Sequence, residues 1–191
     1  SLACGGDKRA GRHPRGAQRR AFGVSEISYR DAVVADALAL AEFAQRTWVA
    51  TFGDLYPPED LAAYLVAKYG ADIQRREIAD GDTRYRLGLR NHELVGYCMM
   101  GALDLPVDDN EGVELHRLYV AEGVKGAGVA AALMQDAIDW ARERGARAMY
   151  LSVWENNVRA QRFYRRFGFA DHSVWDFMVG RVADRDYIWW L

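Results

Sequence analysis

The chain has few cysteines and no long apolar run. Only Cys4 and Cys98 occur, far apart and without Cys-x-x-Cys spacing, which argues against a disulfide framework and a zinc site. No stretch reaches the roughly 18 consecutive apolar residues of a membrane span, and residues 1–22 lack the apolar segment of a secretory signal. We therefore expect a cytoplasmic protein with no membrane partner and no metal.

Charge is unevenly distributed along the chain. The net charge is -2, yet residues 1–22 carry a local balance of +5 and the remainder carries -7. Basic arms can bind nucleic acid, but a short Gly/Arg/Pro segment is more often a solvated leader. We interpret residues 1–22 as an arm or leader and expect no nucleic-acid partner. Residues 23–191 show no linker, so we expect them to form a single domain.

Hydrophobic periodicity predicts an alternation of strands and helices. The expected elements are, in order, a strand at 25–32, helices at 32–50, 58–70 and 72–79, strands at 83–90, 93–105 and 114–120, a helix starting near Val129, a strand at 148–154, a helix capped by Asn157 and stopped by Gly168, and a closing hairpin at 172–180 and 186–191. A strand, a helix and a buried strand in succession form a β-α-β unit. The predicted class is α/β with a mixed sheet.

The segment "KGAGVA", Lys125 to Ala130, lies where a strand gives way to an amphipathic helix. The first N–H groups of a helix have no internal partner and can hold a diphosphate, which glycines allow to approach closely. Glycine is equally the default residue of a tight turn. The segment matches neither a Walker loop nor the dinucleotide fingerprint. On the residues alone, a phosphate cradle and an ordinary turn both remain open.

A longer pattern resembles a known family. Residues 114–169 are similar to the core of the GNAT superfamily of N-acetyltransferases, which bind acetyl-CoA at a Gln/Arg-x-x-Gly-x-Gly/Ala turn. The match continues in a set of residues at the usual spacing, namely Asn157, Ala160, Tyr164, Gly168 and Phe169. Residues 51–65 and 177–191 resemble the PaiA-type branch, bacterial enzymes associated with acetylating spermidine and spermine. One departure is Lys125, a point charge in place of the usual Gln or Arg.

The resemblance implies a GNAT fold. Its central sheet is mixed, mostly antiparallel and splayed around the β-α-β unit, with helices on both faces. It also implies transfer of an acetyl group from acetyl-CoA, as co-substrate, to a primary amine of a small molecule. Because Cys98 has no evident neighbour that would activate it, we expect direct attack in a ternary complex rather than an acetyl-enzyme.

The resemblance also assigns roles to residues. Acetyl-CoA would contact Leu118, Tyr119, Val120, Lys125, Gly126, Ala127, Gly128, Val129, Ala130, Asn157 and Tyr164. The N–H of Leu118 would face the acetyl carbonyl and that of Val120 the pantetheine arm. Glu114 would be the catalytic base with His116 as second candidate, and Tyr164 the acid that protonates the departing thiolate. Each side chain also fits a purely structural role. Glu114 could be a solvated carboxylate, and His116 and Tyr164 could be packing residues. Asn157 could be a helix cap.

The acceptor is less constrained by the sequence. The run from Asp104 to Glu114 carries five acidic residues, and a rim of one charge would concentrate a polyamine. Such a run also suits a solvated loop, an aminoglycoside or the amino groups of a protein. A CoA-binding sensor without turnover is the alternative from another functional class. From the superfamily we expect a homodimer.

Overall fold

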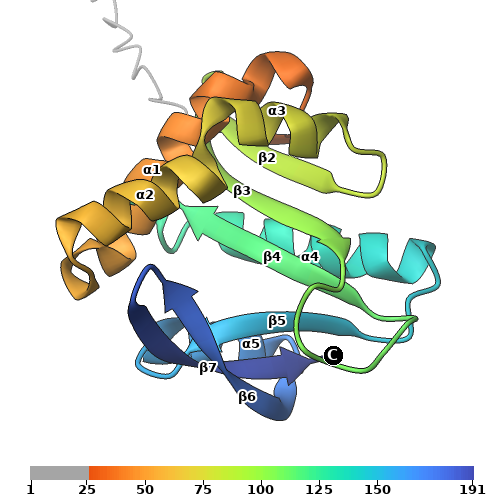
Figure 1. The fold of residues 1–191 in the computed structure, drawn as a ribbon. Helices are drawn as coiled ribbons and strands as arrows, with labels where there is room; N and C mark the ends of the chain where they lie inside the picture. The colour runs from red at the N-terminus through yellow and green to blue at the C-terminus, as the bar shows by residue number, and fades with distance from the viewer. Residues whose placement is uncertain (1–25) are drawn as a thin grey trace, which may run out of the picture.

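The computed structural model describes residues 26–191, and one seven-stranded sheet runs through them (Figure 1). The strand order is β1-β2-β3-β4-β5-β7-β6. Every neighbouring pair is antiparallel except β4 and β5, which are parallel. The predicted class, a mixed and mostly antiparallel sheet, is confirmed.

The first half of the sheet is a meander with helices inserted after its first strand. β1 (Ile27–Asp31) is followed by α1 (Ala37–Phe52), α2 (Pro58–Tyr69) and α3 (Ala71–Ala79), and then by β2 (Arg84–Arg90), β3 (Glu93–Ala102) and β4 (Val113–Val120). The turn between β2 and β3 has positive φ at both Asn91 and His92, 52° and 67°. This is the hairpin geometry that matches the twist of the strands.

The second half contains the β-α-β unit and a hairpin. A short 3-10 turn (Glu122–Val124) leads into α4 (Val129–Glu143), which is followed by β5 (Met149–Trp154), α5 (Val158–Arg166), β6 (Ala170–Val179) and β7 (Val182–Trp190). The Asn157 side chain accepts a hydrogen bond from the N–H of Ala160 at 3.1 Å, so the predicted cap of α5 is confirmed. Gly168 follows the helix with φ of 95°, as a left-handed stop requires.

Two predicted boundaries were wrong. The first helix begins at Ala37 rather than at residue 32, because a 3-10 turn (Val34–Asp36) precedes it. The Asp36 carboxylate accepts from the N–H of Val33 at 2.8 Å and pairs with Arg30, which holds that turn. The last strand begins at Val182 rather than at residue 186, since β6 and β7 pair up to a tight turn at Gly180.

Helices cover both faces of the sheet, as Figure 1 shows. α4 and α5 pack on one face, where α4 contributes Leu133, Met134 and Ala137 to the larger core cluster. α1, α2 and α3 pack on the other face, where α1 contributes Leu40, Phe43 and Trp48 to a second cluster. β5 contributes Met149, Leu151 and Val153 to the larger cluster, and Tyr150 on its other face belongs to a third, smaller cluster.

The α1–α2 end bridges the two halves of the sheet. The rings of Phe52 and Trp154 lie 6.1 Å apart, and those of Tyr64 and Phe177 lie 6.0 Å apart. At the hairpin turn, Arg181 pairs with Asp60 of α2 at 3.2 Å. These contacts link the helices to β5 and to the β6–β7 hairpin and enclose the space between them.

Candidate active site

The sheet opens between its two parallel strands. β4 and β5 pair only at Val113 with Met149 and at Glu114 with Tyr150, and beyond that point they diverge, as Figure 1 shows. A cavity of about 1330 Å³ occupies this opening and extends from the start of α4 to the β6–β7 hairpin. It is larger than a typical single-ligand pocket. It can therefore hold two reactants at once.

The edge of β4 presents backbone donors to this opening. Ala121 donates its N–H to Val95 of β3 at 2.8 Å. Hydrogen-bonded and non-hydrogen-bonded pairs alternate along antiparallel strands. Val120, opposite Gly96, and Leu118, opposite Cys98, therefore occupy non-hydrogen-bonded positions. Their N–H groups therefore point away from β3, into the gap that β5 leaves.

The glycine turn has the geometry of an anion cradle. Gly126 and Gly128 have φ of 85° and 82°. A Cβ added at either glycine would meet no atom within 4 Å, so the space beside the turn is open. The first hydrogen bond of α4 runs from the N–H of Ala132 to Gly128 at 3.0 Å. The preceding N–H groups of the helix are thus left for a ligand at its positive end.

The diphosphate of acetyl-CoA fits this turn, because main-chain donors in an open cradle are what a phosphate group requires. The predicted contact residues that line the cavity are Leu118, Tyr119, Val120, Lys125, Gly126, Gly128, Val129, Ala130, Asn157 and Tyr164. Ala127 does not line it, since its N–H donates within the turn to Val124 at 3.1 Å. The Lys125 ammonium is paired with Glu122, so part of its charge is already neutralised.

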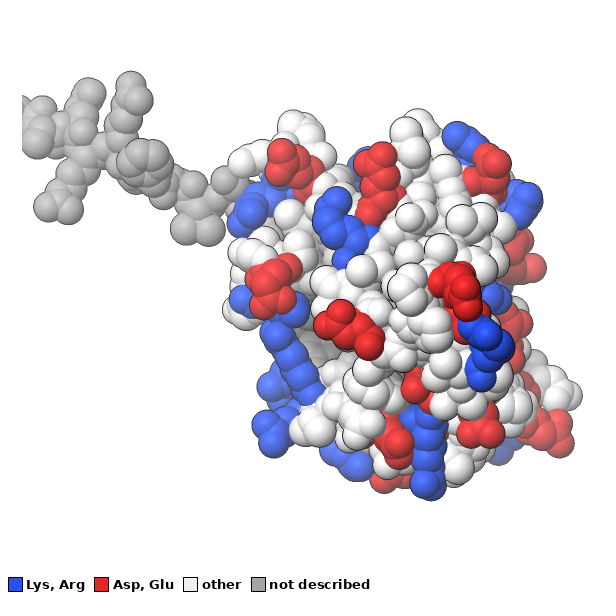
Figure 2. Space-filling model, turned by 60° about the vertical axis from the view of Figure 1, so that its left-hand side comes forward, with Lys and Arg blue, Asp and Glu red and all other residues white. Residues whose placement is uncertain are grey.

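Three arginines of α5, which the sequence interpretation missed, add positive charge near this turn. Arg159, Arg162 and Arg166 line the cavity and are exposed. Their spacing of three and four residues places them on one face of the helix, and this pattern could have been read from the sequence. Figure 2 shows basic side chains gathered along the lower left of its view. Cations at this end complement the phosphates of a CoA molecule.

The candidate base is held by its neighbours. Glu114 is buried, and its Oε2 accepts hydrogen bonds from the N–H groups of Asp104 at 2.9 Å and Leu105 at 3.1 Å. Its Oε1 lies 3.1 Å from Nδ1 of His116, whose Nε2 lies 3.0 Å from the carbonyl oxygen of Ala102. Both predicted residues line the cavity and touch each other. Glu114 is therefore a buried carboxylate and not the solvated one that its place at the start of a strand would suggest.

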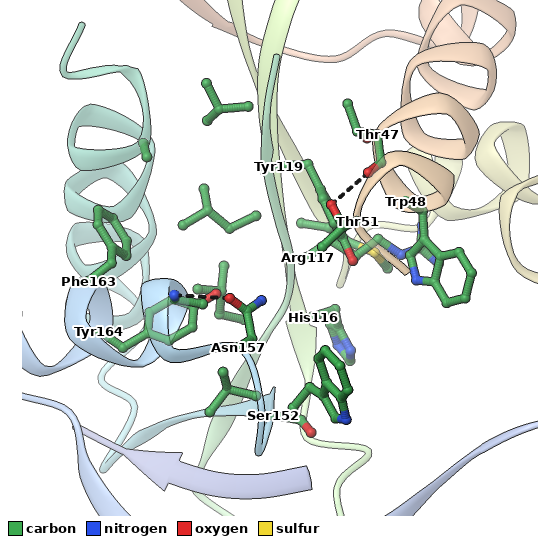
Figure 3. Close-up of a pocket in the computed structure, with 18 of the residues that line it drawn as sticks. Thr47, Trp48, Thr51, His116, Arg117, Tyr119, Ser152, Asn157, Phe163 and Tyr164 are labelled. Atoms are coloured by element: carbon green, nitrogen blue, oxygen red, sulfur yellow. Dashed lines mark hydrogen bonds between the residues drawn. The ribbon is translucent and has the colours of Figure 1, made fainter. Parts of the chain in front are cut away.

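Tyr164, Asn157 and His116 all line the cavity, and Figure 3 shows the first two on one side of the central strands and His116 on the other. Burial raises the pKa of the Tyr164 phenol to about 12, so the hydroxyl is protonated at neutral pH and can donate. Tyr164 also packs against Phe163, at a ring distance of 5.6 Å, and against Phe169. The packing role that periodicity suggested and a donor role are therefore compatible.

The expected acidic rim is only partly present. Of its five carboxylates, Asp104 and Glu114 line the cavity. Asp109 instead accepts a hydrogen bond from the Tyr150 hydroxyl at 2.9 Å. Other carboxylates of the cavity wall include Asp184 and Asp186 of β7. Sequence reasoning missed this pair, although its alternate spacing in a strand places both on one face.

Several expectations concern absences or lie outside the described residues. Cys98 is buried and does not line the cavity, and burial raises the pKa of its thiol to about 12. Among residues 26–191, no group of three or more His, Cys, Asp or Glu is arranged to hold a metal ion. No helix in the same range is long and apolar enough to cross a membrane.

Cys4 and the basic arm at 1–22 lie outside that range. A cytoplasmic location, the single domain and the homodimer stay predictions.

Comparisons with known proteins find similar N-acetyltransferases. An uncharacterised N-acetyltransferase of Mycobacterium tuberculosis is 32% identical over 153 residues, which are 80% of this chain and 95% of the relative. A spermine/spermidine N(1)-acetyltransferase of Bacillus subtilis is 34% identical over 97 residues, 49% of this chain and 64% of the relative. The crystal structure of the PaiA N-acetyltransferase of Thermoplasma acidophilum in complex with coenzyme A has a TM-score of 0.71 at 21% identity, covering 86% of this chain and 98% of the other.

The family of the chain follows from its match to a family model. Residues 39–169 match the acetyltransferase (GNAT) family, and this range contains the splayed strands, the glycine turn and both helices of the candidate CoA site. The chain belongs to the GNAT family of N-acetyltransferases and uses acetyl-CoA.

Proposed function

We propose that the enzyme acetylates a primary amine of a small cationic molecule, with polyamines as the leading candidates, by direct attack in a ternary complex. The observation that carries this proposal is the charge layout of the cavity. Its α4–α5 end is lined by three arginines and by Lys125, which is paired with Glu122. The hairpin end is lined by the carboxylates of Asp184 and Asp186, and the cation Arg117 elsewhere in the wall is paired with Glu77. An anionic donor and a cationic acceptor would bind at opposite ends and meet between them.

The protein supplies three functions to the reaction. The N–H of Leu118 polarises the acetyl carbonyl and stabilises the charge that develops on its oxygen. An alkylammonium, with a pKa near 10.4 in solution, must lose a proton before it attacks. Glu114 and His116 form the pair that accepts this proton, through water if the amine lies beyond direct reach, and release it to solvent.

Tyr164 acts at the sulfur. As the nitrogen–carbon bond forms and the carbon–sulfur bond breaks, negative charge collects on the departing sulfur, and the phenol donates to it. A phenol with a pKa of about 12 is a weaker acid than a thiol of pKa about 8.5. Its contribution therefore comes mainly from the hydrogen bond to the developing charge. The nitrogen gains a positive charge as it attacks and loses a second proton when the amide forms, and this proton balances the one that the departing thiolate takes up.

Two observations support the direct route and the polyamine class. Cys98 is buried away from the cavity, which leaves an acetyl-enzyme without a cysteine nucleophile among the described cavity residues. The Bacillus subtilis relative, named as a spermine/spermidine N(1)-acetyltransferase, is 34% identical over the 97 residues it shares. Acetylation of an aminoglycoside or of a protein amino group would require the same cradle and differs only in the acceptor.

The test is thiol release from acetyl-CoA in the presence of spermidine, 1,4-diaminobutane, kanamycin and a peptide with a free amino terminus. We expect the two aliphatic amines to accelerate release most. Acetyl-CoA binding without acceleration by any amine would favour the sensor alternative and contradict the proposal. Replacing Glu114→Gln keeps one oxygen for the N–H groups of Asp104 and Leu105, and we expect a roughly 100-fold loss of kcat/KM. Asp108→Asn, from the same loop but outside the cavity, is the control.

A further inference from the structure

The end of the cavity far from the glycine turn contains a carboxylate pair that the roles above do not use. Asp184 and Asp186 alternate along β7 and both line the cavity. In the sheet register, Asp186 lies between Trp154 of β5 and Trp175 of β6, and Asp184 lies opposite Phe177. Paired residues in neighbouring antiparallel strands project from the same face. The acids and the rings therefore face the same space, which we call the hairpin niche.

Asp186 is held in place on one side only. The Ser152 hydroxyl donates to its Oδ2 at 2.6 Å, and the Trp175 indole N–H donates to the same hydroxyl at 2.9 Å. The residue is 8% exposed. No Lys, Arg or His among residues 26–191 forms an ion pair with Asp186 or Asp184. A buried carboxylate without a cation is costly, so a binding partner from outside the chain would stabilise it.

The neighbouring groups add to this cost. Burial, helped by the carboxylates of Asp184 and Glu155, raises the pKa of Asp186 to about 6 against the opposing hydrogen bond from Ser152. Asp184 has a donor of its own, the Tyr56 hydroxyl. Negative charge is thus concentrated at one place, as a site for a cation requires.

Many of the residues in the walls of the niche are aromatic. The rings that line the cavity around the carboxylates are Trp48, Phe52, Tyr56, Tyr64, Trp154, Trp175 and Phe177. Ring faces attract cations and ring surfaces cover methylene groups. An aminoglycoside would bring many hydroxyl groups that these walls could not satisfy. The contacts of α1 and α2 with the hairpin also limit the space for a protein chain.

We propose that the hairpin niche binds the ammonium group and the methylene stem of an aliphatic amine, with Asp186 as the anchoring residue and Asp184 in support. This inference rests on the proposed function and narrows its acceptor to alkylamines. Amines that carry a carboxylate beside the nitrogen, such as free amino acids, are excluded because the carboxylates of β7 would repel them.

Binding can be measured apart from catalysis. The full chain, saturated with coenzyme A, is titrated by calorimetry with 1-butylamine, 1,4-diaminobutane and the uncharged 1-butanol. Asp186→Asn keeps the size of the side chain and an oxygen for Ser152 but removes the charge. Asp184→Asn is the second variant. The matched control is Asp176→Asn, an exposed residue of β6 that lies outside the cavity wall.

We expect both amines to bind the wild-type protein and 1-butanol to show no measurable binding. Asp186→Asn should raise the Kd of the amines by roughly tenfold or more, as loss of one charge-assisted hydrogen bond predicts. Asp184→Asn should have a smaller effect in the same direction, and Asp176→Asn should stay within about twofold, as a distant surface charge would.

Three results would overturn the inference: wild-type affinity in Asp186→Asn, equal binding of 1-butanol and 1-butylamine, or no amine binding by the protein–CoA complex. Thiol release, measured in parallel, separates this outcome from failure of the proposed function. If amines are acetylated but their Kd is unchanged in Asp186→Asn, the hairpin niche is not the amine site and the proposed function is retained. If binding depends on Asp186 but no amine is acetylated, the niche stands as an amine site and the function is wrong.

Discussion

The two ends of the cavity carry opposite charge and are built in opposite ways. Near α4 and α5, the binding groups are main-chain N–H donors and exposed side chains such as Arg162. Near the hairpin, they are side chains such as Asp186, which is buried and held by Ser152. Exposed charges attract a ligand from a distance but are screened by salt. A buried charge acts only at contact and discriminates more strongly between ligands.

This difference matches the demands of the two reactants. Main-chain N–H groups can hold the phosphates of acetyl-CoA whatever the neighbouring side chains are, so a cradle that depends on backbone geometry suffices for the donor. The acceptor varies among enzymes, and its site is assembled from side chains of α1, α2, β5, β6 and β7. The first site constrains few residue identities, whereas the second depends on nearly every side chain that lines it.

Tyr164, on the wall between the two ends, should separate chemistry from binding. Tyr164→Phe removes the hydroxyl that donates to the departing sulfur, and we expect kcat to fall by roughly 100-fold. Steady-state kinetics should show the KM of both reactants nearly unchanged. Tyr150→Phe, which removes a hydroxyl bonded to Asp109 outside the cavity, is the control. An unchanged kcat in Tyr164→Phe would leave the tyrosine a packing role only.

Gly128 tests the backbone-built end alone. Gly128→Ala places a Cβ in the open cradle at φ of 82°, so we expect the Kd of acetyl-CoA to rise by about tenfold or more, from crowding and strain. Amine binding at the hairpin niche should not change. Gly145→Ala controls for strain, because Gly145 has φ of 69° and open space beside it at the other end of α4. Equal losses of CoA affinity in both variants would exclude a role for the cradle.

The α5 arginines should contribute through long-range attraction. Arg162→Gln is expected to weaken acetyl-CoA binding by a few-fold in low salt, about the scale of an exposed charge, and by less in high salt. Arg165→Gln is the matched control, since Arg165 belongs to the same helix but lies outside the cavity wall and pairs with Asp171 at 3.2 Å. Calorimetry at two salt concentrations gives the comparison. A loss of acetyl-CoA affinity in Arg162→Gln that is equal at both salt concentrations would contradict long-range electrostatic attraction.

Asp186 should make the acidic end sensitive to pH even without a ligand. Its pKa is about 6 in the folded chain, against an ordinary value of 3.8, so folding favours its protonated form. That contribution to stability is complete below the ordinary value and is lost as the pH rises through about 6. Asp186→Asn should therefore raise the free energy of unfolding by ~1–2 kcal/mol at pH 8 and by much less at pH 4. Urea unfolding at both pH values provides the measurement, and a variant that is destabilised at pH 8 would contradict it.

The donor end could be predicted from the sequence because its signals are local. Lys125–Ala130 places glycines directly before an amphipathic helix, and Asn157 directly before another. The acceptor end could not be predicted in the same way. The acidic run at 104–114 was the obvious local candidate, yet Asp109 is engaged by Tyr150 outside the cavity. The niche instead forms where Trp154, Trp175 and Asp186 come into register from three strands.

The sequence by itself determined the α/β class, the order of elements, the glycine turn and the position of Glu114 beside His116. These follow from periodicity, turn chemistry and residue spacing, which act over a few neighbours along the chain. Only the tertiary structure decided that β4 and β5 separate after Glu114, and that β7 brings Asp184 and Asp186 to the far end of the same cavity. Strand order and side-chain burial depend on contacts between segments distant in sequence, and no local pattern in a single chain records them.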